Sequence, residues 1–327
     1  MTAVLAVDAG GSHTRAACVD ATGRVIGWGT ATGGNATSLG EQGLDAIEQA
    51  CRTAIEQAGA DAATLTAVLC AAGEAPTSRR ALLASRLGFD DDTSWHIVGD
   101  ALGAYFSGSS APEGIVLVAG TGAVAARIEQ SRLVEVVDGL GWLIGDKGGG
   151  FWIGREVVSC AAEAADGRGP ATSLVEHLLA RMPREQRPWS GVRTSEIAAI
   201  LRGVYDRTPT VLADLAPLAF AAAAEGDAVA SSILSAAAGH LARTVMTVRS
   251  GYEQLPVVVA GSVLTRGLLG APGAFSSELH EALRGADVRH ATDGVVGAAV
   301  LALQRGGIEV SDSVRVLLAE EVARRRR

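Results

Sequence analysis

The chain contains 327 residues and carries a formal net charge of −8; 48% of the residues are hydrophobic, but only 4% are aromatic. This length allows two domains that each have a core of their own. An acidic chain of this kind argues against binding to a nucleic-acid backbone, which needs a basic face. The one basic cluster, Arg324 to Arg327, is better interpreted as the solvated end of a helix.

The cysteines and the first residues bear on the cellular compartment. Cys18, Cys51, Cys70 and Cys160 stand far apart, so no pair has the C-x-x-C spacing of a zinc or redox site. We expect buried free thiols in a reducing cytoplasm. The opening apolar run stops at Asp8 and follows no basic segment, and no later stretch resembles a membrane span. We therefore expect a cytoplasmic protein that does not contact membranes.

The first third of the chain alternates between strands and helices. Apolar runs predict strands at residues 3–7, 14–19, 25–30, 66–71 and 95–98. Apolar residues at helical spacing predict helices at 39–58, 78–87 and 101–106. Tight turns join the first three strands into a meander.

The strand meander then recurs. Strands predicted at 115–119, 124–129 and 133–137 repeat the order of strand, glycine-rich turn, strand, strand. Residues 156–250 are rich in alanine and predict an almost wholly helical insertion. The remaining elements are strands at 256–260 and 288–290 and helices at 293–304 and 311–327. The pattern predicts an α/β protein of two related halves with mainly parallel sheets.

Three glycine-rich turns lie far apart in the sequence, each after an apolar strand. They are Asp8 to Thr14, Gly120 to Gly122, and Gly261 with Ser262. Because glycine has no Cβ, such turns let backbone N–H groups approach an anion. One of them alone is usually just a tight turn, but together they predict two hairpin turns around a triphosphate and a third beside a nucleoside. P-loop and Rossmann glycine motifs are absent, which disfavours those enzyme classes.

Two aspartates follow predicted strands and suit phosphoryl transfer, which needs a cation near the phosphates and a base for the attacking hydroxyl. Asp8 is predicted to hold Mg²⁺ through water, beside the first glycine turn. Asp100 is predicted to be the base, because it lies where a strand ends and a helix begins. The alternative for Asp100 is a plain helix N-cap.

The segment 138–154 mixes seven glycines with Trp142, Phe151 and Trp152. A solvated loop would not hold so many large apolar side chains, which predicts a binding loop in which Asp146 accepts hydrogen bonds. The alternative is a kinked loop whose aromatic residues join the core, and for each tryptophan alone this is the better interpretation. Asn35 is either a turn or cap residue or a contact to a ligand hydroxyl.

These motifs resemble a known family. The string G-x-G-W-x-x-G-D at residues 139–146 and the string G-x-x-x-W-I-G at 148–154 are similar to the N-acetylglucosamine kinase and BadF/BcrA-type ATPase family. That family belongs to the superfamily of actin, the heat-shock chaperone ATPases and the sugar kinases. The resemblance covers most of the chain, and the size and alanine content resemble the actinobacterial glucosamine kinases of the family.

The resemblance implies a two-lobed actin-like (ribonuclease H-like) ATPase fold, an α/β fold with a duplicated domain and a central cleft. The expected first lobe is residues 1–110, and the expected second lobe is 111–292 with its helical insertion at about 156–250. The C-terminal region, about 293–327, is expected to return to the first lobe.

The resemblance also implies roles for single residues. Asp100 matches the catalytic base and a sugar contact. The two phosphate loops correspond to Gly10, Gly11, Ser12 and Thr14, and to Gly120, Thr121 and Gly122. The nucleotide-side turn corresponds to Gly261 and Ser262. The further sugar contacts correspond to Asn35, Gly139 and Asp146. The expected cofactors are ATP and Mg²⁺, with the metal beside Asp8.

Two departures from the family pattern bear on the sugar. Lys147 stands where the N-acetylglucosamine kinases usually carry Glu, and Gly148 to Gly150 are richer in glycine than their pattern. Both leave room for a free amine, which surplus carboxylate would favour; the candidates are Asp138, Asp146 and Glu74. We therefore expect phosphorylation of D-glucosamine to glucosamine 6-phosphate, with N-acetylglucosamine as the alternative. A homodimer is expected because these kinases are often dimers.

Two other functions stay open from the sequence. One is a BadF-type ATPase activator, whose relatives hold an iron–sulfur cluster through cysteines near the second phosphate loop; residues 116–127 contain no Cys. The other is a nucleotide switch without catalysis, which would not need Asp100. ROK-type sugar kinases resemble a pattern with clustered His and Cys zinc ligands, which the chain lacks.

Overall fold

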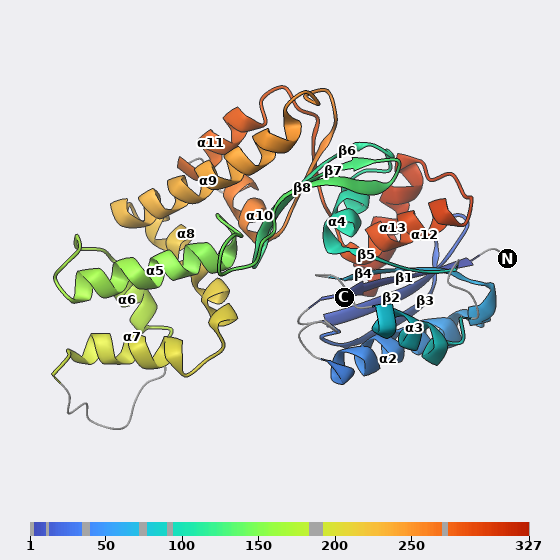
Figure 1. The fold of residues 1–327 in the computed structure, drawn as a ribbon, viewed down its shortest axis with the longest axis horizontal. Coiled ribbons are helices and arrows are strands. Elements are labelled where there is room, and N and C mark those ends of the chain that lie inside the picture. The colour runs from blue at the N-terminus through green and yellow to red at the C-terminus, as the bar shows by residue number, and fades with distance from the viewer. Residues whose placement is uncertain are drawn as a thin grey trace.

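The computed structural model describes residues 3–10, 13–34, 40–71, 77–89, 94–182, 192–269 and 274–326. Figure 1 shows two lobes side by side, with strands β6 to β8 and helix α4 between them. Each lobe contains one five-stranded sheet. The predicted Glu74 and Asn35 lie outside the described residues, as do Gly11 and Ser12 of the first glycine turn.

The first sheet has the strand order β3-β2-β1-β4-β5. Its strands are β1 (Ala3–Ala9), β2 (His13–Asp20), β3 (Val25–Thr32), β4 (Thr66–Ala71) and β5 (Trp95–Gly99). The central strand β1 pairs antiparallel with β2 and parallel with β4. Every strand predicted in this lobe is present, extended by one to two residues at some ends.

The second sheet repeats this topology, with the order β8-β7-β6-β9-β10. Its strands are β6 (Gly114–Ala119), β7 (Ala123–Glu129), β8 (Arg132–Asp138), β9 (Val257–Ala260) and β10 (Val288–His290). The duplication predicted from the two meanders is therefore confirmed. The expectation of mainly parallel sheets is wrong, since each sheet has two antiparallel and two parallel pairings. Short hairpin turns join the meander strands, and such turns allow only antiparallel pairing.

The helices form layers on and between the two sheets. Helices α2 (Glu41–Ala58) and α3 (Thr77–Leu87) share a buried cluster with one face of the first sheet. Helices α4 (Asp100–Gly108) and α12 (Gly294–Arg305) share a second cluster with residues of both sheets, so they lie between them. Helix α13 (Asp312–Arg325) adds Leu318 and Val322 to that cluster.

The outer face of the second sheet is covered by the helical insertion, at the left of Figure 1. This layer contains α5 (Gly150–Ala165), α6 (Leu174–Leu179), α7 (Ser195–Tyr205), the 3₁₀ helix η2 (Pro209–Leu215), α8 (Ala216–Ala224) and α9 (Ala228–Arg249). Helices α10 (Ser262–Leu269) and α11 (Ala274–Ala282) follow β9, and a second 3₁₀ turn, η1 (Ala62–Thr64), lies in the first lobe. The sequence did not predict α10 and α11.

The glycine-rich segment 138–154 is not a loop throughout. The loop ends at Gly149, because helix α5 begins at Gly150 and includes both Phe151 and Trp152. Phe151 is buried and Trp152 is half-buried. The interpretation that aromatic residues join the core is thus correct for Phe151 and, in part, for Trp152, but it is wrong for Trp142, which is 42% exposed. Glycine has a poor helix propensity, which hid the start of this helix in the sequence.

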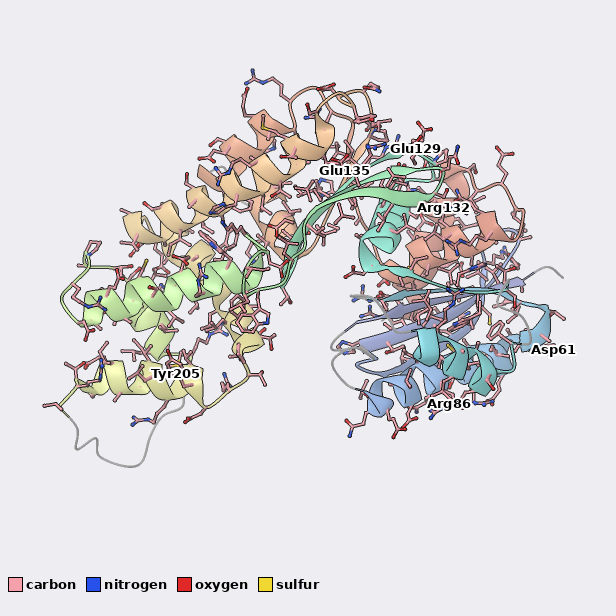
Figure 2. The ribbon with its side chains drawn as sticks, in the orientation of Figure 1. Asp61, Arg86, Glu129, Arg132, Glu135 and Tyr205 are labelled. Carbon is pink, nitrogen blue, oxygen red and sulfur yellow. The ribbon has the colours of Figure 1, made fainter. Side chains whose placement is uncertain are left out.

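The outer edge of the second sheet is charged. Figure 2 shows Glu129, Arg132 and Glu135 along the β7–β8 hairpin. Arg127 on β7 pairs with Glu129 at 3.1 Å and with Glu135 at 3.3 Å. Charges along an edge strand oppose its pairing with a strand from another chain.

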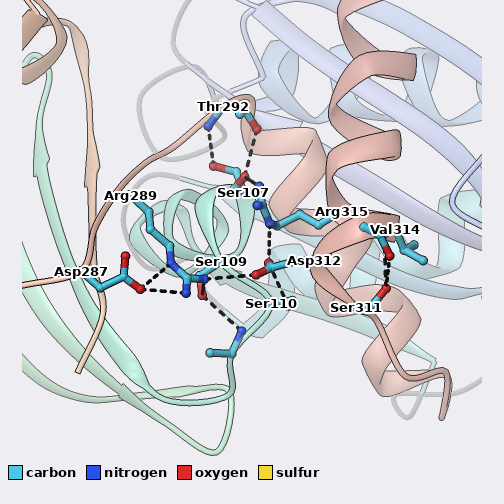
Figure 3. Close-up of polar contacts among 12 residues, drawn as sticks. Ser107, Ser109, Ser110, Asp287, Arg289, Thr292, Ser311, Asp312, Val314 and Arg315 are labelled. Carbon is cyan, nitrogen blue, oxygen red and sulfur yellow. Dashed lines mark hydrogen bonds and ion pairs between the residues drawn. The ribbon is translucent and has the colours of Figure 1, made fainter. Parts of the chain in front are cut away.

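The two crossings between the lobes are tied together by side chains (Figure 3). Chain segment 109–113 runs from α4 to β6, and segment 291–293 runs from β10 back to α12. The Thr292 N–H donates to Ser107 Oγ at 3.0 Å, and its hydroxyl donates to the Ser107 carbonyl at 3.1 Å. Arg315 of α13 donates to the same carbonyl at 3.1 Å. Asp312 of α13 pairs with Arg289 of β10 at 3.4 Å, so α13 is also tied to these crossings.

Candidate functional site

The two predicted phosphate turns occupy equivalent positions in the two sheets. Strand β1 ends at Ala9 and β2 begins at His13, while β6 ends at Ala119 and β7 begins at Ala123. The Gly10 N–H donates to the His13 carbonyl at 3.0 Å, and the Gly120 N–H donates to the Gly122 carbonyl at 3.0 Å. Because β1 and β6 are the central strands of their sheets, each lobe has a glycine turn at the carboxyl end of its central strand.

The second turn is where the other glycine motifs converge. The N–H groups of Gly150 and Phe151, at the start of α5, donate to the carbonyls of Gly120 at 2.7 Å and Thr121 at 2.9 Å. A Cβ at Gly149 would lie 2.6 Å from the carbonyl carbon of Gly122. Glycine is therefore needed for α5 to pack this closely against the turn. The run at 148–150 that departs from the family pattern has a packing role.

Gly261 brings the third turn to the same place. Its φ is +98°, and a Cβ there would collide with the carbonyl of Ala119, at the end of β6. Both the backbone angle and the contact exclude a larger residue. Ser262 then begins α10. Thus Gly120 to Gly122 and Gly261 with Ser262, which the sequence predicted to act together, are brought together in the structure.

A cavity of about 240 Å³ opens beside these turns. Its walls come from the β6–β7 turn, from η2 and α8, and from α10; they include Thr121, Asp214, Phe220, Ser262 and Arg266. The Arg266 guanidinium lies 5.9 Å from the centre of the Phe220 ring, within cation–π range. A Cβ at Gly120, which also lines this cavity, would meet no atom within 4 Å. The open space that its missing side chain leaves over the turn suits a phosphate group.

The acidic part of the site lies in the first lobe, around Asp8 at the end of β1. Arg15 is its partner in the β1–β2 register, with Nη1 3.7 Å from Asp8 Oδ2. The carboxyl group also packs on the start of α12, since a Cβ at Gly294 would lie 2.5 Å from Asp8 Cγ. Burial and the neighbouring Asp293 raise the pKa of Asp8 to about 6, and Arg15 opposes this. Asp100 contributes to the same rise, so Asp8, the predicted metal residue, and Asp100, the predicted base, share one electrostatic environment.

Asp100 is the first residue of α4, at the carboxyl end of β5, as predicted. The N-cap residue is Gly99, so the alternative of a plain N-cap does not describe Asp100. Its side chain is exposed. Nearby protein still removes enough water to raise the pKa of Asp100, while the N–H groups of Ala101 and of Asp100 itself oppose the rise. An exposed carboxylate with a raised pKa suits a general base.

The acidic side chains of the site suit Mg²⁺ only as an ion that keeps most of its water. Within the described ranges, no three His, Cys, Asp or Glu side chains converge as direct metal ligands. Mg²⁺ commonly keeps several waters and binds through one or two carboxylates and substrate phosphates. Asp8 alone fits that mode. Burial is the main cause of its raised pKa, and the nearby carboxylates of Asp293 and Asp100 add negative charge that a cation would offset.

Asp146 lies with the second turn. Its carboxylate packs against Gly122 and accepts hydrogen bonds from the N–H groups of Ala123 and Gly141. Burial, together with Asp138, raises the pKa of Asp146. Asp138 in turn accepts from the Asp146 N–H at 2.7 Å.

The remaining predicted residues lie apart from the cavity. Gly139 has φ +70°, and its N–H donates to the Ala123 carbonyl, so it supports β7. Thr14 is buried, and its hydroxyl lies against Gly34 without a hydrogen-bond partner in the described ranges. Lys147 is exposed, and its charge acts on His240 of α9.

Sequence reasoning missed three kinds of site residue. Arg15 faces Asp8 across the first hairpin, and a register drawn from the short turn could have found it. The sequence predicted Asp293 only as the first residue of a helix. It gave no reason to single out Phe220 and Arg266, because neither belongs to a recognisable motif. Their positions depend on contacts between distant parts of the chain.

Two duplicated lobes, a glycine turn at the centre of each sheet and an aspartate at the end of β1 define the class of actin-like, ribonuclease H-like ATPase folds, as predicted. A family model described as the BadF/BadG/BcrA/BcrD ATPase family matches residues 5–302. The chain belongs to this family. No helix within the described ranges has the length and apolarity to cross a membrane.

Individual relatives agree with this assignment. The curated N-acetyl-D-glucosamine kinase of Dictyostelium discoideum is 26% identical over 323 residues, covering 91% of this chain and 97% of that protein. A solved structure assigned as an N-acetylglucosamine kinase, from Chromobacterium violaceum, has a TM-score of 0.71 at 20% identity and covers 93% of this chain and 99% of its own. One from Porphyromonas gingivalis has a TM-score of 0.61 at 22% identity, covering 93% and 100%. The two structures show that the fold is shared.

Proposed function

We propose that the protein is an ATP-dependent sugar kinase that phosphorylates an amino sugar. The observation that carries this proposal is Asp100, an exposed carboxylate of raised pKa at the carboxyl end of β5, in the same electrostatic environment as Asp8. An ATPase that only changes shape has no need of a base at this position. The name of the Dictyostelium relative supports a sugar as the acceptor.

In the proposed reaction, Asp100 accepts the proton of the attacking sugar hydroxyl. The hydroxyl oxygen forms a bond to the γ-phosphorus, while the bond from that phosphorus to the bridging oxygen of ADP breaks. Gly120 to Gly122 offer backbone N–H groups beside the phosphates, and Phe220, Ser262 and Arg266 line the nucleoside side of the cavity. Mg²⁺, held through water by Asp8, would offset phosphate charge.

The identity of the amino sugar is the finer part of the proposal. The sequence favoured D-glucosamine because of Lys147 and Gly148 to Gly150. In the structure these glycines pack against Gly122, Gly120 and α9, and the charge of the exposed Lys147 acts on His240, so both departures have an explanation that needs no sugar. We therefore propose N-acetylglucosamine as the first substrate to test and D-glucosamine as the second, with the 6-hydroxyl as the acceptor in both.

The alternative of an iron–sulfur ATPase activator has less support. Cys18, Cys51 and Cys70 are buried within the first lobe, and Cys160 lies on α5. None lies within residues 116–127, near the second phosphate loop, where the resemblance places the cluster ligands of the activator branch. Buried thiols agree with a cytoplasmic location, which, like a homodimer, remains part of the proposal.

The test is a coupled assay of ADP release with Mg-ATP and a panel of hexoses and amino sugars. We expect turnover that depends on an amino sugar and falls by about 10³-fold or more in Asp100→Asn, because the base is removed while the size is kept. Glu113→Gln serves as a control at an exposed carboxylate outside the site. ADP release that ignores the sugar and survives Asp100→Asn would exclude the kinase.

A further inference from the structure

A buried carboxylate lies behind the proposed metal-side residue Asp8. Asp293 is 8% exposed and caps α12, with its Oδ1 accepting from the Val295 N–H at 3.1 Å. Its other oxygen, Oδ2, accepts from Arg326 Nη1 at 2.9 Å. Arg326 immediately follows α13, so the end of that helix is joined to the start of α12.

Asp293 also shares an arginine with Asp8. The same nitrogen, Arg15 Nη1, lies 3.6 Å from Asp293 Oδ2 and 3.7 Å from Asp8 Oδ2. Both distances are at the long end for an ion pair, so Arg15 is divided between two carboxylates. Gly294, the next residue after Asp293, packs directly on the Asp8 carboxyl group.

Asp293 needs a cationic partner such as Arg326, because its carboxylate is charged and buried. A buried carboxylate without a partner is strongly destabilising, and helix capping alone does not neutralise it. If Arg326 were absent, Asp293 would compete for Arg15 and draw it away from Asp8. An exposed ion pair has little worth as a stabilising contact. The Arg326 side chain is 50% exposed, whereas its partner Asp293 is only 8% exposed. The role of Arg326 is therefore to neutralise a buried carboxylate rather than to form a surface ion pair.

We propose that Asp293 and Arg326 are positioning residues for phosphoryl transfer: Arg326 neutralises Asp293, so that Arg15 stays on Asp8 and holds its carboxylate in one orientation. This rests on the proposed function, in which Asp8 acts beside the phosphates. Neither Asp293 nor Arg326 is a catalytic residue, since both act through Arg15. The proposal gives the segment after α13 a direct link to the site.

The decisive test measures binding rather than turnover. Calorimetry gives the affinity for ADP with and without Mg²⁺, and the ratio reports how well Mg²⁺ is held. We expect Arg326→Ala to reduce this ratio about tenfold, the usual effect of losing a residue that orients a metal ligand. If Arg326 acted only through its charge, the ratio should instead rise in Arg326→Ala, because removing a positive charge near the site would strengthen Mg²⁺ binding.

Three variants complete the design. Arg326→Lys keeps a cation and should restore most of the ratio. Asp293→Asn keeps a good N-cap residue but loses the charge that competes for Arg15, so it should leave the ratio close to the wild-type value. Arg324→Ala is the matched control, because Arg324 pairs with Glu321 on the surface of the same helix end. In the kinase assay, Arg326→Ala should lower kcat about tenfold and leave the KM for the sugar within about twofold.

The outcomes separate the two proposals. An unchanged or larger Mg²⁺ effect in Arg326→Ala overturns the positioning role, and so does a wild-type protein whose ADP affinity ignores Mg²⁺. Wild-type protein without sugar-dependent turnover overturns the kinase, whereas the binding ratios still report on Asp293 and Arg326. A thermal unfolding midpoint close to that of Arg324→Ala would exclude loss of folding as the cause.

Discussion

The carboxylate of Asp146 lies directly on the α-carbon of Gly122, so that a Cβ at this position would overlap it. Asp146 in turn accepts the N–H of Ala123, the first residue of β7. The second glycine turn is therefore shaped from outside by a side chain of the following loop. The two residues form one unit in which the shape of the turn depends on the position of the carboxylate.

Gly122→Ala is expected to displace Asp146 and to distort the turn. Overpacking of this kind costs about 1–3 kcal/mol of stability. We also expect the KM for ATP to rise about tenfold, because the backbone N–H groups lose their alignment. Urea unfolding and ADP-release kinetics measure the two effects.

Gly120→Ala is the matched control in the same turn. A Cβ there meets open space, so the free energy of unfolding should stay within about 0.5 kcal/mol of wild type. The same methyl group would occupy the cavity, so the KM for ATP should still rise. Equal stability losses in both variants would contradict this interpretation of the turn.

Arg266→Ala is expected to weaken nucleotide binding without affecting the sugar. Arg266 lines the cavity and lies over Phe220, and cation–π contacts contribute about 0.5–2 kcal/mol. The KM for ATP should therefore rise about threefold to tenfold. Arg168→Ala, which removes a surface partner of Asp166, is the control. If the KM for the sugar changed more than the KM for ATP, the cavity beside Arg266 would not be the nucleotide site.

The two hydrogen bonds between Ser107 and Thr292, where the chain crosses between the lobes, predict different losses of stability for two variants. Thr292→Val removes one hydroxyl and should lower the free energy of unfolding by about 1 kcal/mol. Ser107→Ala should lower it by about 1–3 kcal/mol, because Ser107 is buried and the Thr292 N–H loses its acceptor. Denaturant titration checks the order of the two values. The reverse order would mean that the N–H finds another partner.

Asp8 gives the fold a dependence on pH. The folded protein raises the pKa of Asp8 from 3.8 to about 6, so the folded state holds this proton more tightly than the unfolded state does. Stability from this group is therefore present at low pH, falls as the pH rises from about 4 to about 6, and stays lower above that range.

Asp8→Asn removes this loss. We expect the variant to be more stable than wild type near neutral pH by roughly 1–3 kcal/mol, and the difference to vanish below about pH 4. Kinase activity should fall in the same variant. Urea titrations across this pH range measure the difference, and two parallel stability curves would argue against Asp8 as its source.

The fold could be predicted from local patterns to a large extent. Apolar runs and short turns identified every strand of both meanders, and the repeat of residues 3–30 at 115–137 indicated the duplication. Helices α10 and α11 were missed, since no pattern between β9 and β10 was recognised. The start of α5 was missed because glycines needed for close packing resemble the glycines of a loop.

The candidate site was predictable only where it follows a strand. Asp8, Asp100 and the turns at Gly120 and Gly261 each end a buried strand, and parallel or duplicated strands bring such ends to one edge. The roles of Arg15 and Asp293 depend on their ion pairs, and the pairs that Asp293 forms join residues far apart in the sequence. The placement of such partners depends on tertiary packing.

Helices α4 and α12 belong to one buried cluster with residues of both sheets, and Gly297 of α12 packs against the Gly103 carbonyl of α4. A polypeptide made from its N-terminus would complete β1 to β5 long before residues 294–305 exist. Until then, the side of the first sheet that α12 covers stays open to water or to chaperones. Duplication in this chain therefore does not yield two independent folding units: on the ribosome, the N-terminal lobe cannot complete its core until residues 294–305 have been made.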